Sequence, residues 1–597
     1  MSISTAPDAP PSQDPRGRLR LRESWALLKP YWVSEDRKAG LVLLAVVVGL
    51  NLAVVAVNVW LNNWNRIFYN TLEQRDFPGF KTALWQFCAI AAVFIVVAVL
   101  KQFATMRLQM RWRTWMTGRF LDRWMAHQAY YRIEQGGRAD NPDQRISEDI
   151  RSLTSDSLTL SLGLLNSVVT LLSFIAILWT LSGPLSFVLS GHAITIPGYM
   201  VWVALVYAVA GSWSTHKVGK PLIGLYFRQE QTEAGFRYGL VRLRENAEGV
   251  ALYHGEGSEK TQLRDRFELI RENWHGLVKY MRRLVFVNSG YGQAAIVFPL
   301  IVAAPRYFSG KLTLGGLMQI NSAFGQVQGA LSWFVDSYSS LVNWQASANR
   351  LIDLEQAIAT AEREETHRDG RQGIVVDDTA TALQVEGLVL NVPGRAADAP
   401  LTAPVDLTVA PGERWLVSGP SGSGKSVLFR ALAGIWPYGR GRVAHPAGKR
   451  LLFLPQKSYV PNGSLAEALC YPEPPSAHTP AELEALLRDC RLAALAGRLD
   501  DVDNWALRLS PGEQQRLAFG RAVLYRPDYL FLDEATSALD EESEAAMYQL
   551  LADRLPGTAV VSIAHRSTVA RWHDRQIRYL AQPEGSAAPF APSQVPL

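Results

Sequence analysis

The feature that most constrains the fold is the uneven distribution of apolar residues along the 597-residue chain. Long apolar runs fill the first 345 residues, and the composition after them is that of a water-soluble domain. A helix of about 20 apolar residues crosses the roughly 30 Å hydrocarbon core of a bilayer. We therefore expect an α-helical six-span membrane domain, followed by a second domain in water. The expected spans are Gly40–Asn62, Phe80–Leu100, Ser157–Leu181, Tyr199–Ser214, Leu284–Pro305 and Leu314–Asn343.

The charges between the spans predict the orientation of the chain in the membrane. Lysine and arginine are frequent between the second and third spans and again from Lys217 to Arg283, whereas residues 182–198 contain neither. Because positively charged loops remain in the cytoplasm, we expect both termini and the second domain there. The formal charge of +5 then follows from topology, and no nucleic-acid partner is expected.

A glycine-rich loop begins the chemistry of the second domain. It fits the pattern G-x-x-x-x-G-K-[ST], between a predicted strand at 414–417 and a predicted helix at 427–432. Such a loop wraps nucleotide phosphates with its backbone N–H groups, while the lysine reaches the β- and γ-phosphates and the hydroxyl helps hold Mg²⁺. A Gly/Ser turn that matches by chance is the alternative. The residues expected to bind the nucleotide are Gly419, Pro420, Ser421, Gly422, Ser423, Gly424, Lys425 and Ser426.

Polar residues at the ends of later apolar strands suggest ATP hydrolysis. They are Gln456, Asp533, Glu534 and His565. Phosphoryl transfer to water depends on positioning and charge stabilisation. Asp533 would hold Mg²⁺ with Ser426 and Gln456, and Glu534 would orient or deprotonate the attacking water. Gln456 and His565 would sense the γ-phosphate, although a histidine taken alone is more often structural.

In this order, these residues resemble the nucleotide-binding domain of an ABC transporter. The glycine-rich loop resembles its Walker A motif, Gln456 its Q-loop, and Leu509–Arg516 its signature. Asp533 and Glu534 match the end of Walker B, and His565 matches the switch histidine. The resemblance implies a homodimer in which each ATP lies between one chain's Walker A and the other chain's signature. It adds Ser510, Gly512, Glu513 and the D-loop residue Asp540 to the expected ATP-binding residues. The aromatic residue that stacks on adenine in the family has no counterpart in Leu388–Pro393.

Segments of the membrane domain indicate which branch of the ABC transporters the chain resembles. Residues 29–32, 65–70, 141–146, 233–237 and 244–253 resemble segments of the bacterial SbmA/BacA-like transporters and of the peroxisomal acyl-CoA ABC transporters. A polar turn and a solvated helix are the plainer interpretation of the two inner-loop segments. The bacterial branch fits better, and within it the members fused to an ATPase, related to a mycobacterial transporter of cobalamin and hydrophilic peptides. This resemblance implies an exporter-type fold used for uptake across a bacterial inner membrane.

Several polar residues fall within the expected spans. Those in the first and sixth spans are Asn58, Asn62, Asn63, Gln319, Asn321, Gln326, Gln328, Asp336 and Asn343. Polar groups at membrane depth are costly unless they face a bundle interior or a wet cavity. They predict a cavity for hydrophilic cargo, and hydrogen bonds between neighbouring helices are an equal alternative.

These inferences combine into one expected organisation. We expect a cytoplasmic tail at 1–18, the membrane domain with an elbow helix at 19–354, a linker at 355–378, the ATPase domain at 379–585 and a tail at 586–597. The expected function is ATP-driven uptake of hydrophilic peptides or cobalamin-like compounds. The alternatives are an exporter or acyl-CoA carrier with the same fold, and a membrane ATPase that regulates without transporting.

Overall fold

The computed structural model describes residues 20–137, 140–189, 192–366, 373–392, 400–583, 586 and 588–596. The expected tail at 1–18 therefore lies outside the described residues. The chain forms two compact units. The first comprises Met1–Arg123 and Ala139–Gln356, and the second comprises Trp124–Arg138 and Ala357–Leu597.

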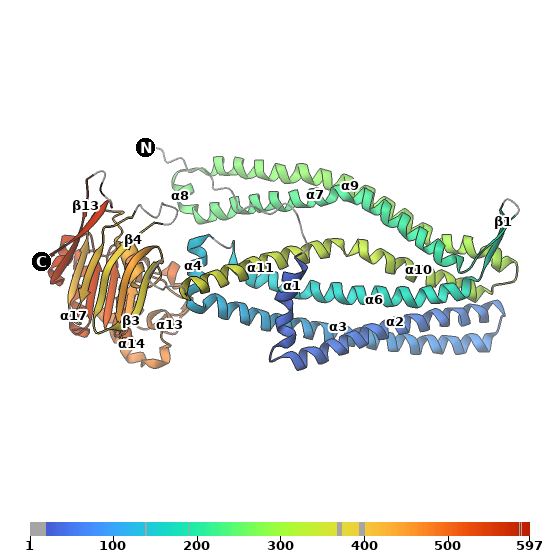
Figure 1. Ribbon diagram of the computed structural model, residues 1–597, viewed down its shortest axis with the longest axis horizontal. Helices are drawn as coiled ribbons and strands as arrows, with labels where there is room; N and C mark the ends of the chain where they lie inside the picture. Colours follow the sequence, from blue (N-terminus) through green and yellow to red (C-terminus); the bar gives the residue numbers. More distant parts are fainter. Residues whose placement is uncertain are drawn as a thin grey trace. The chain divides into compact units, whose positions relative to one another are not determined.

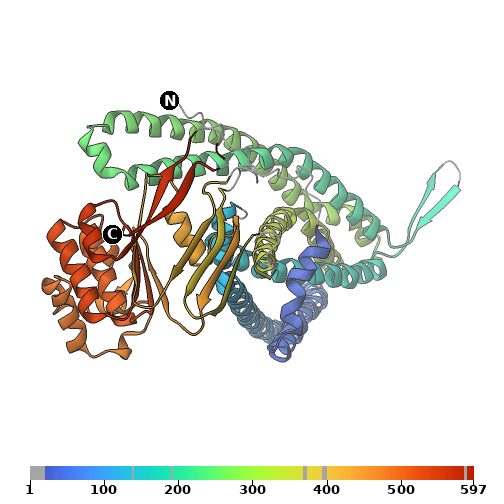
Figure 2. The same ribbon diagram turned by 60° about the vertical axis from the view of Figure 1, so that its left-hand side comes forward.

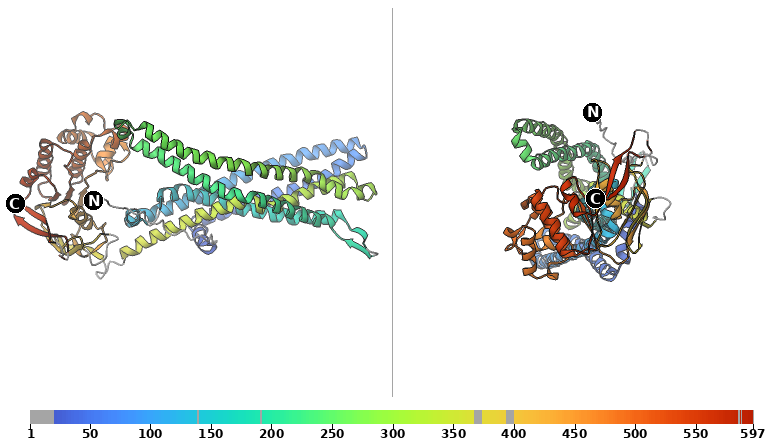
Figure 3. Two further views of the ribbon diagram at one scale, coloured as in Figure 1. Left: turned by 90° about the horizontal axis from the view of Figure 1, so that it is seen from above. Right: turned by 90° about the vertical axis from the view of Figure 1, so that its left-hand side faces the viewer.

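The first unit is a bundle of long helices that run side by side (Figure 1, Figure 3). A short helix, α1, precedes them and corresponds to the expected elbow. Two short helices, α5 and η3, lie between α3 and α6 in this unit. A hairpin of β1 and β2 joins α6 to α7. The helices are α1 (Leu21–Leu28), η1 (Lys29–Val33), α2 (Arg37–Glu73), α3 (Phe77–Met125), α5 (Pro142–Gln144), η3 (Arg145–Asp149), α6 (Ile150–Ser182), α7 (Tyr199–Glu245), α8 (Ala247–Leu252), α9 (Glu256–Phe308), α10 (Leu314–Asp336) and α11 (Tyr338–Thr366), and the strands are β1 (Leu185–Leu189) and β2 (His192–Ile196).

Four helical segments among the described residues are long and apolar enough to cross a membrane. They are Arg37–Glu73, Phe77–Gly136, Pro142–Ser182 and Glu256–Phe308, and they contain the expected first, second, third and fifth spans. The expected fourth span lies in α7, where the apolar stretch soon gives way to Lys217 and Lys220. The expected sixth span is divided, because α10 ends at Asp336 and α11 begins at Tyr338. A count of six spans therefore stays a prediction.

The second unit contains a larger sheet, a smaller sheet (Figure 2) and a short two-stranded pair of β9 (Gly463–Ser464) and β10 (Val502–Asp503). Five strands of the larger sheet are parallel, and its strand order is β14-β13-β6-β12-β11-β8. Its strands are β6 (Arg414–Ser418), β8 (Leu451–Leu454), β11 (Tyr529–Asp533), β12 (Ala559–Ile563), β13 (Arg575–Ala581) and β14 (Phe590–Pro596). The smaller sheet has the order β3-β7-β4-β5, with β3 (Gly373–Ala380), β4 (Leu383–Leu390), β5 (Val405–Val409) and β7 (Gly439–Pro446).

Burial explains the apolar runs that the sequence shows in this unit. Strand β12 is buried along its whole length, and only the last residue of β11 is partly exposed. Central parallel strands are covered on both faces and therefore have continuous apolar sequences. Trp415, interpreted from the sequence as a core residue, is only 2% exposed on β6. The helices of this unit include α4 (Ala129–Gly136), α12 (Lys425–Leu432), α13 (Leu465–Cys470), α14 (Pro480–Asp489), α16 (Pro511–Tyr525) and α17 (Glu541–Arg554).

Two segments differ from the organisation expected from sequence. The expected linker at 355–378 holds the end of α11 and the first part of β3, in which Ile374 is buried. The charged residues of β3 hid the strand, and one of them, Asp377, pairs with Arg442 of β7. The expected tail at 586–597 holds β14, which pairs with β13 along the backbone. The sequence of β14 contains two prolines and lacks the alternation of apolar and polar residues that predicts a strand, so backbone pairing could not be read from it.

A buried histidine makes the stability of the second unit sensitive to acid. Burial lowers the pKa of His573 to about 4. Its Nδ1 lies 2.9 Å from the Val569 carbonyl oxygen and its Nε2 lies 2.8 Å from Ser562 Oγ. The carbonyl can only accept, so Nδ1 carries the proton and Nε2 accepts from the serine hydroxyl.

We expect the unfolding free energy of the second unit to fall as the pH drops from 6.5 towards 4. Above about pH 6.5 the His573 side chain is neutral in both the folded and the unfolded state. Between about pH 6.5 and 4 it is protonated in the unfolded state and stays neutral in the folded state. The loss approaches about 3 kcal/mol near pH 4. Thermal unfolding of the wild type and of His573→Asn, at about pH 7 and about pH 5, measures this. The pH dependence should be shallower in the variant, and equal slopes would contradict the prediction.

Candidate nucleotide site and membrane cavity

The glycine-rich loop connects β6 to α12 in the second unit. Gly419, Gly422 and Gly424 have φ values of +149°, +78° and +93°, which L side chains rarely adopt. A Cβ at Gly419 would lie 2.7 Å from Tyr579 Cβ and 3.0 Å from the Tyr579 carbonyl oxygen. The loop is thus held tightly against β13.

We expect Gly419→Ala to reduce ATP hydrolysis by about tenfold or more, because the new methyl group displaces the loop and strains its backbone. Steady-state ATPase activity and nucleotide affinity of the purified protein measure the effect. Gly497→Ala is the matched control, because its Cβ meets nothing within 4 Å and its φ is ordinary. Wild-type activity in Gly419→Ala would show that the loop tolerates a side chain.

Lys425 begins α12 and folds back over the loop. Its Nζ donates hydrogen bonds to the carbonyl oxygens of Gly419, at 3.0 Å, and Pro420, at 2.8 Å. The residue is 5% exposed, and this burial lowers the pKa of Lys425, while the nearby carboxylates of Glu534 and Asp533 oppose the shift. The ammonium group is therefore held over the centre of the glycine cradle.

Ser426 and Asp533 form an oxygen pair beside the loop. The Ser426 hydroxyl donates to Asp533 Oδ1 at 3.0 Å. Burial raises the pKa of Asp533, Glu534 raises it further, and the Ser426 hydrogen bond opposes both. A bound cation would relieve this desolvation, and hydroxyl and carboxylate oxygens are ligands that Mg²⁺ prefers.

Glu534 contacts the other two expected catalytic residues, Gln456 and His565. Its Oε2 accepts a hydrogen bond from Gln456 Nε2 at 2.8 Å, and its Oε1 lies 3.0 Å from His565 Nε2. The backbone at Glu534 has a φ of +49°, and its N–H donates to the Ile563 carbonyl oxygen of β12 at 3.0 Å. Glu534 and His565 line a cavity of about 220 Å³. Gln456, also expected as a metal ligand, contacts Glu534 rather than the Ser426–Asp533 pair.

The expected signature and D-loop residues occupy two helix N-termini. Ser510 caps α16 and exchanges hydrogen bonds with Glu513, which lower the pKa of Glu513. Gly512 lies against the backbone of Ala538, because a Cβ added at Gly512 would be 3.1 Å from the Ala538 carbonyl oxygen. Asp540 caps α17 by accepting from the Ser543 N–H at 2.6 Å. Among the hydrogen bonds of the described chain, none joins the signature to the glycine-rich loop.

Sequence reasoning gave no role to Gln515 or Tyr579. The Gln515 side chain donates to the Gln456 carbonyl oxygen at 3.4 Å and to Ser537 Oγ at 3.1 Å, and its Oε1 accepts from the Ala538 N–H at 2.9 Å. It therefore joins the signature helix to the Q-loop and the D-loop. The position of Gln515 within the signature segment could have indicated a role. Nothing in the sequence marks Tyr579 as the neighbour of Gly419.

The loop residues fit a nucleotide. Ser423 Oγ is buried and has no hydrogen-bond partner in the described part of the chain. An orphaned buried hydroxyl is costly and is normally paired by a ligand or water. Together with the glycine cradle and the Lys425 ammonium group, it provides donors for phosphate oxygens.

In the first unit, polar residues of three helices line one cavity. It has a volume of about 280 Å³ between α2, α6 and α10. The residues that line it include Asn58, Asn166, Ser167, Thr170, Gln326 and Asp336. Other predicted polar residues bond to neighbouring helices instead. Asn62 Nδ2 donates to the Gln319 carbonyl oxygen at 3.1 Å, and Gln319 Nε2 donates to Asn63 Oδ1 at 2.9 Å. Some of the predicted polar residues therefore line a cavity, and others bond to neighbouring helices.

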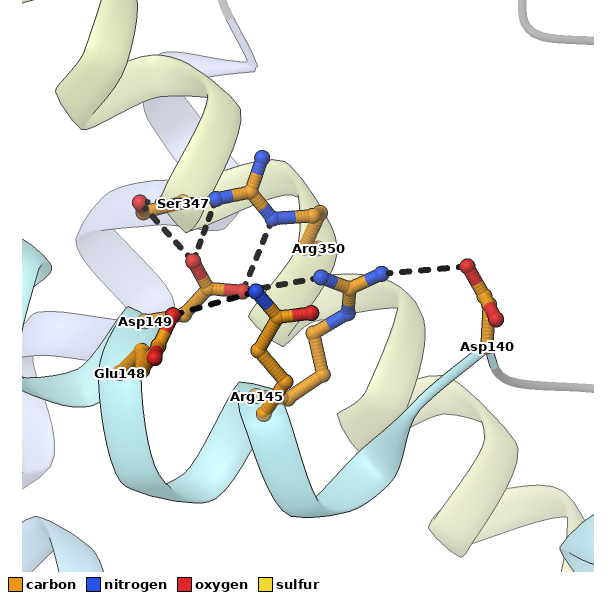
Figure 4. A network of polar contacts seen from close by, with 7 residues as sticks. Asp140, Arg145, Glu148, Asp149, Ser347 and Arg350 are labelled. Atoms are coloured by element: carbon orange, nitrogen blue, oxygen red, sulfur yellow. Dashed lines mark hydrogen bonds and ion pairs between the residues drawn. The ribbon is translucent and has the colours of Figure 1, made fainter. Parts of the chain in front are cut away.

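A second polar centre of the first unit surrounds a buried carboxylate (Figure 4). Asp149, whose side chain is 6% exposed, accepts hydrogen bonds from Arg350 Nε at 2.8 Å, Ser347 Oγ at 3.1 Å and Arg145 at 3.3 Å. A second nitrogen of Arg350 completes a bidentate pair. The inner-loop segment 141–146 thus leads directly into a contact with α11.

Family comparisons agree with this two-part construction. Residues 27–308 match the family described as ABC transporter transmembrane region 2, and residues 402–537 match the family described as ABC transporter. The fold resembles that of a solved bacterial Atm1-family ABC exporter with ATP bound, at a TM-score of 0.68 and 18% identity, over 91% of this chain and 93% of that one.

Several relatives match this chain over most of its length. The inner membrane ABC transporter ATP-binding protein YddA of Escherichia coli is 34% identical over 92% of this chain and 96% of its own length. The chloroplastic ABC transporter D family member 2 of Arabidopsis thaliana is 33% identical, over 96% and 88% of the two chains. The human lysosomal cobalamin transporter ABCD4 is 26% identical, over 95% of each.

Proposed function

Because this chain belongs to the ABC transporter family, with its transmembrane and ATP-binding domains fused, we propose that it imports hydrophilic solutes across a bacterial inner membrane. Peptides and cobalamin-like compounds are the proposed cargo. ATP hydrolysis coupled to transport is the activity of the family, and the proposal adds cargo and direction to it. We also assign the chain to the SbmA/BacA-like branch, on the segments quoted from its inner loops and elbow.

The polar cavity of the first unit carries the cargo assignment. Amide and hydroxyl groups from α2, α6 and α10 line one space of about 280 Å³, which Asp336 also lines. Such groups cost free energy in an apolar environment unless they face water or a polar ligand. An acyl chain would leave them unpaired, whereas a peptide or corrin amide would pair with them. The full-length similarity to a cobalamin transporter supports the same class.

At the nucleotide site, the residues divide between binding and hydrolysis. Lys425 and the loop N–H groups would bind the phosphates, and Ser426 and Asp533 would hold Mg²⁺, which would supply positive charge against the negative charge of phosphoryl transfer. Glu534 orients the attacking water and receives its proton. Gln456 and His565 hold the two oxygens of Glu534 in place, and these two side chains would sense the γ-phosphate.

The proposed working form is a homodimer. Ser510, Gly512 and Glu513 make no hydrogen bond with Gly419–Ser426 in the described part of a single chain, so the signature is free to complete the site of a second copy. ABC half-transporters of this type act as dimers, and ATP closing two chains against each other would then drive the helices of the first unit.

Uptake into sealed proteoliposomes tests the proposal. Labelled cobalamin or a proline-rich peptide is placed outside, with ATP either inside or outside, and Glu534→Gln protein as the control. Accumulation driven by lumenal ATP supports import, because cargo then enters from the side opposite the ATPase domain. Accumulation driven only by external ATP would make the protein an exporter. Stimulation of ATP hydrolysis by acyl-CoA alone would favour an acyl-CoA carrier, and ATPase activity without flux of any cargo would favour a regulatory ATPase.

A further inference from the structure

A basic hollow of the first unit, separate from the nucleotide site and the polar cavity, lies between α7 and α9. These two helices run side by side along their length (Figure 1, Figure 3). The hollow has a volume of about 570 Å³. It is lined by Lys217, Val218 and Pro221 of α7 and by Tyr280, Arg282, Arg283, Phe286 and Val287 of α9.

Three cations converge on this hollow without a counter-ion. No ion pair within the described residues involves Lys217, Arg282 or Arg283. Two of the three are instead held against aromatic rings, since Lys217 Nζ lies 4.9 Å from the centre of the Trp213 ring and the Arg283 guanidinium lies 5.5 Å from that of Tyr280. Such contacts orient a cation while leaving its hydrogen-bond donors open. The hollow therefore favours an anion with several acceptor oxygens.

The remaining walls are apolar and continue onto an apolar surface. Val218, Pro221, Phe286 and Val287 complete the lining, and Phe286 is 81% exposed. Only 6% of the most apolar stretch of α9 is buried within the chain. A free phosphate would use the cations and leave these walls in water, whereas a ligand with a charged head and an apolar tail would cover both.

The position of the hollow along the helices identifies the source of such a ligand. Lys217 follows the expected fourth span, which ends at Ser214, and Arg283 directly precedes the expected fifth span, which begins at Leu284. By the predicted orientation, both places lie at the cytoplasmic surface of the bilayer. Basic pockets between helices at this level bind anionic head groups.

We propose that the hollow between α7 and α9 is a binding site for an anionic phospholipid of the cytoplasmic leaflet. Lys217, Arg282 and Arg283 bind the phosphate oxygens of the head group, and Phe286 and Val287 contact the first part of an acyl chain. The inference depends on the predicted orientation of the chain and is independent of the identity of the cargo.

Lipid retention tests the site without cargo or ATP. The purified protein is equilibrated with mixed phosphatidylcholine and phosphatidylglycerol, and retained lipids are counted by native mass spectrometry. We expect the wild type to prefer phosphatidylglycerol by roughly tenfold or more, and the triple variant Lys217→Gln/Arg282→Gln/Arg283→Gln to lose that preference. A control of equal charge change, Arg242→Gln/Lys260→Gln/Arg264→Gln on exposed parts of α7 and α9, should keep it.

Two further variants separate a lipid from other ligands and from misfolding. Arg282→Lys/Arg283→Lys keeps the charge and should keep most of the preference, and Phe286→Ser should weaken lipid retention through the lost apolar contact. An unchanged preference in the triple-glutamine protein would overturn the proposal. So would displacement of the lipid by inorganic phosphate together with no effect of Phe286→Ser, because the site would then recognise phosphate alone. Since no cargo or nucleotide is present, failure of the import proposal leaves this result intact.

Discussion

Glu534→Gln is expected to bind ATP with near wild-type affinity and to lose about 100-fold or more of its hydrolysis rate. The amide has almost the same shape as the carboxylate, so the loop around Lys425 and the Ser426–Asp533 pair should remain intact. An amide, however, cannot receive a proton from water at neutral pH. It also presents a single acceptor oxygen, where Glu534 now accepts from Gln456 through Oε2 and lies 3.0 Å from His565 through Oε1.

The measurement is steady-state ATPase activity beside nucleotide affinity for the same purified protein. Glu541→Gln is the matched control, because it removes an equal charge from the exposed first turn of α17. A variant that hydrolyses ATP near the wild-type rate would remove Glu534 from the proposed mechanism. A variant that fails to bind ATP would show that the charge supports the binding site rather than the chemical step.

The ATPase site was the part most open to prediction from sequence, because its chemistry is local. The glycine-rich loop, the paired carboxylates and the strand-end positions of Gln456 and His565 are visible as short motifs next to apolar strands. The parallel sheet then brings the carboxyl ends of β6, β8, β11 and β12 to one edge. That geometry is a property of the fold, and it places Glu534 between Gln456 and His565.

Contacts that depend on distant parts of the chain could not be predicted in this way. The partner of Asp149 is Arg350, 201 residues away. Tyr579 meets Gly419 only because β13 pairs with β6. Nor did the apolar pattern reveal the break between α10 and α11, because both sides of Ser337 have helical sequences. Periodicity and motifs describe single elements, whereas these features arise from how the elements pack.

The network around Asp149 joins places where the chain passes between the two units. Segments of the first unit end at Arg123 and Gln356 and resume at Ala139. Near the first of these, Arg119 and Arg123 form ion pairs with Glu355 of α11 at 2.8 Å and 3.0 Å. Shortly after Ala139, Asp149 binds Arg350 of the same helix. Two of these places are therefore fixed to α11 by ion pairs within the first unit, and the third, Gln356, lies on α11 itself.

Asp149→Ala is accordingly expected to destabilise the first unit by about 2 kcal/mol and to reduce transport more than ATP hydrolysis. The substitution leaves Ser347 and the Arg350 guanidinium without their shared acceptor, and it frees the loop after Ala139 from α11. The Arg350 side chain is 40% exposed, so water recovers part of the cost, and we place the loss below that of a fully buried pair. The nucleotide residues all lie in the other unit and keep their contacts, so basal hydrolysis should persist while flux per ATP falls.

Thermal unfolding, basal ATPase activity and uptake into proteoliposomes of the same preparation separate these effects. Glu148→Ala is the matched control, because among the described residues the side chain of this exposed neighbour has one hydrogen bond, accepted from Gln144 at 3.1 Å. If Asp149 acts through Arg350, the double variant Asp149→Ala/Arg350→Ala should cost less than the sum of the two single changes. Additive costs would mean that the pair is not the source of stability. A proportional fall of ATPase activity and flux would mean that Asp149 supports folding alone, because a specific role in transport has to change the ratio of cargo moved to ATP spent.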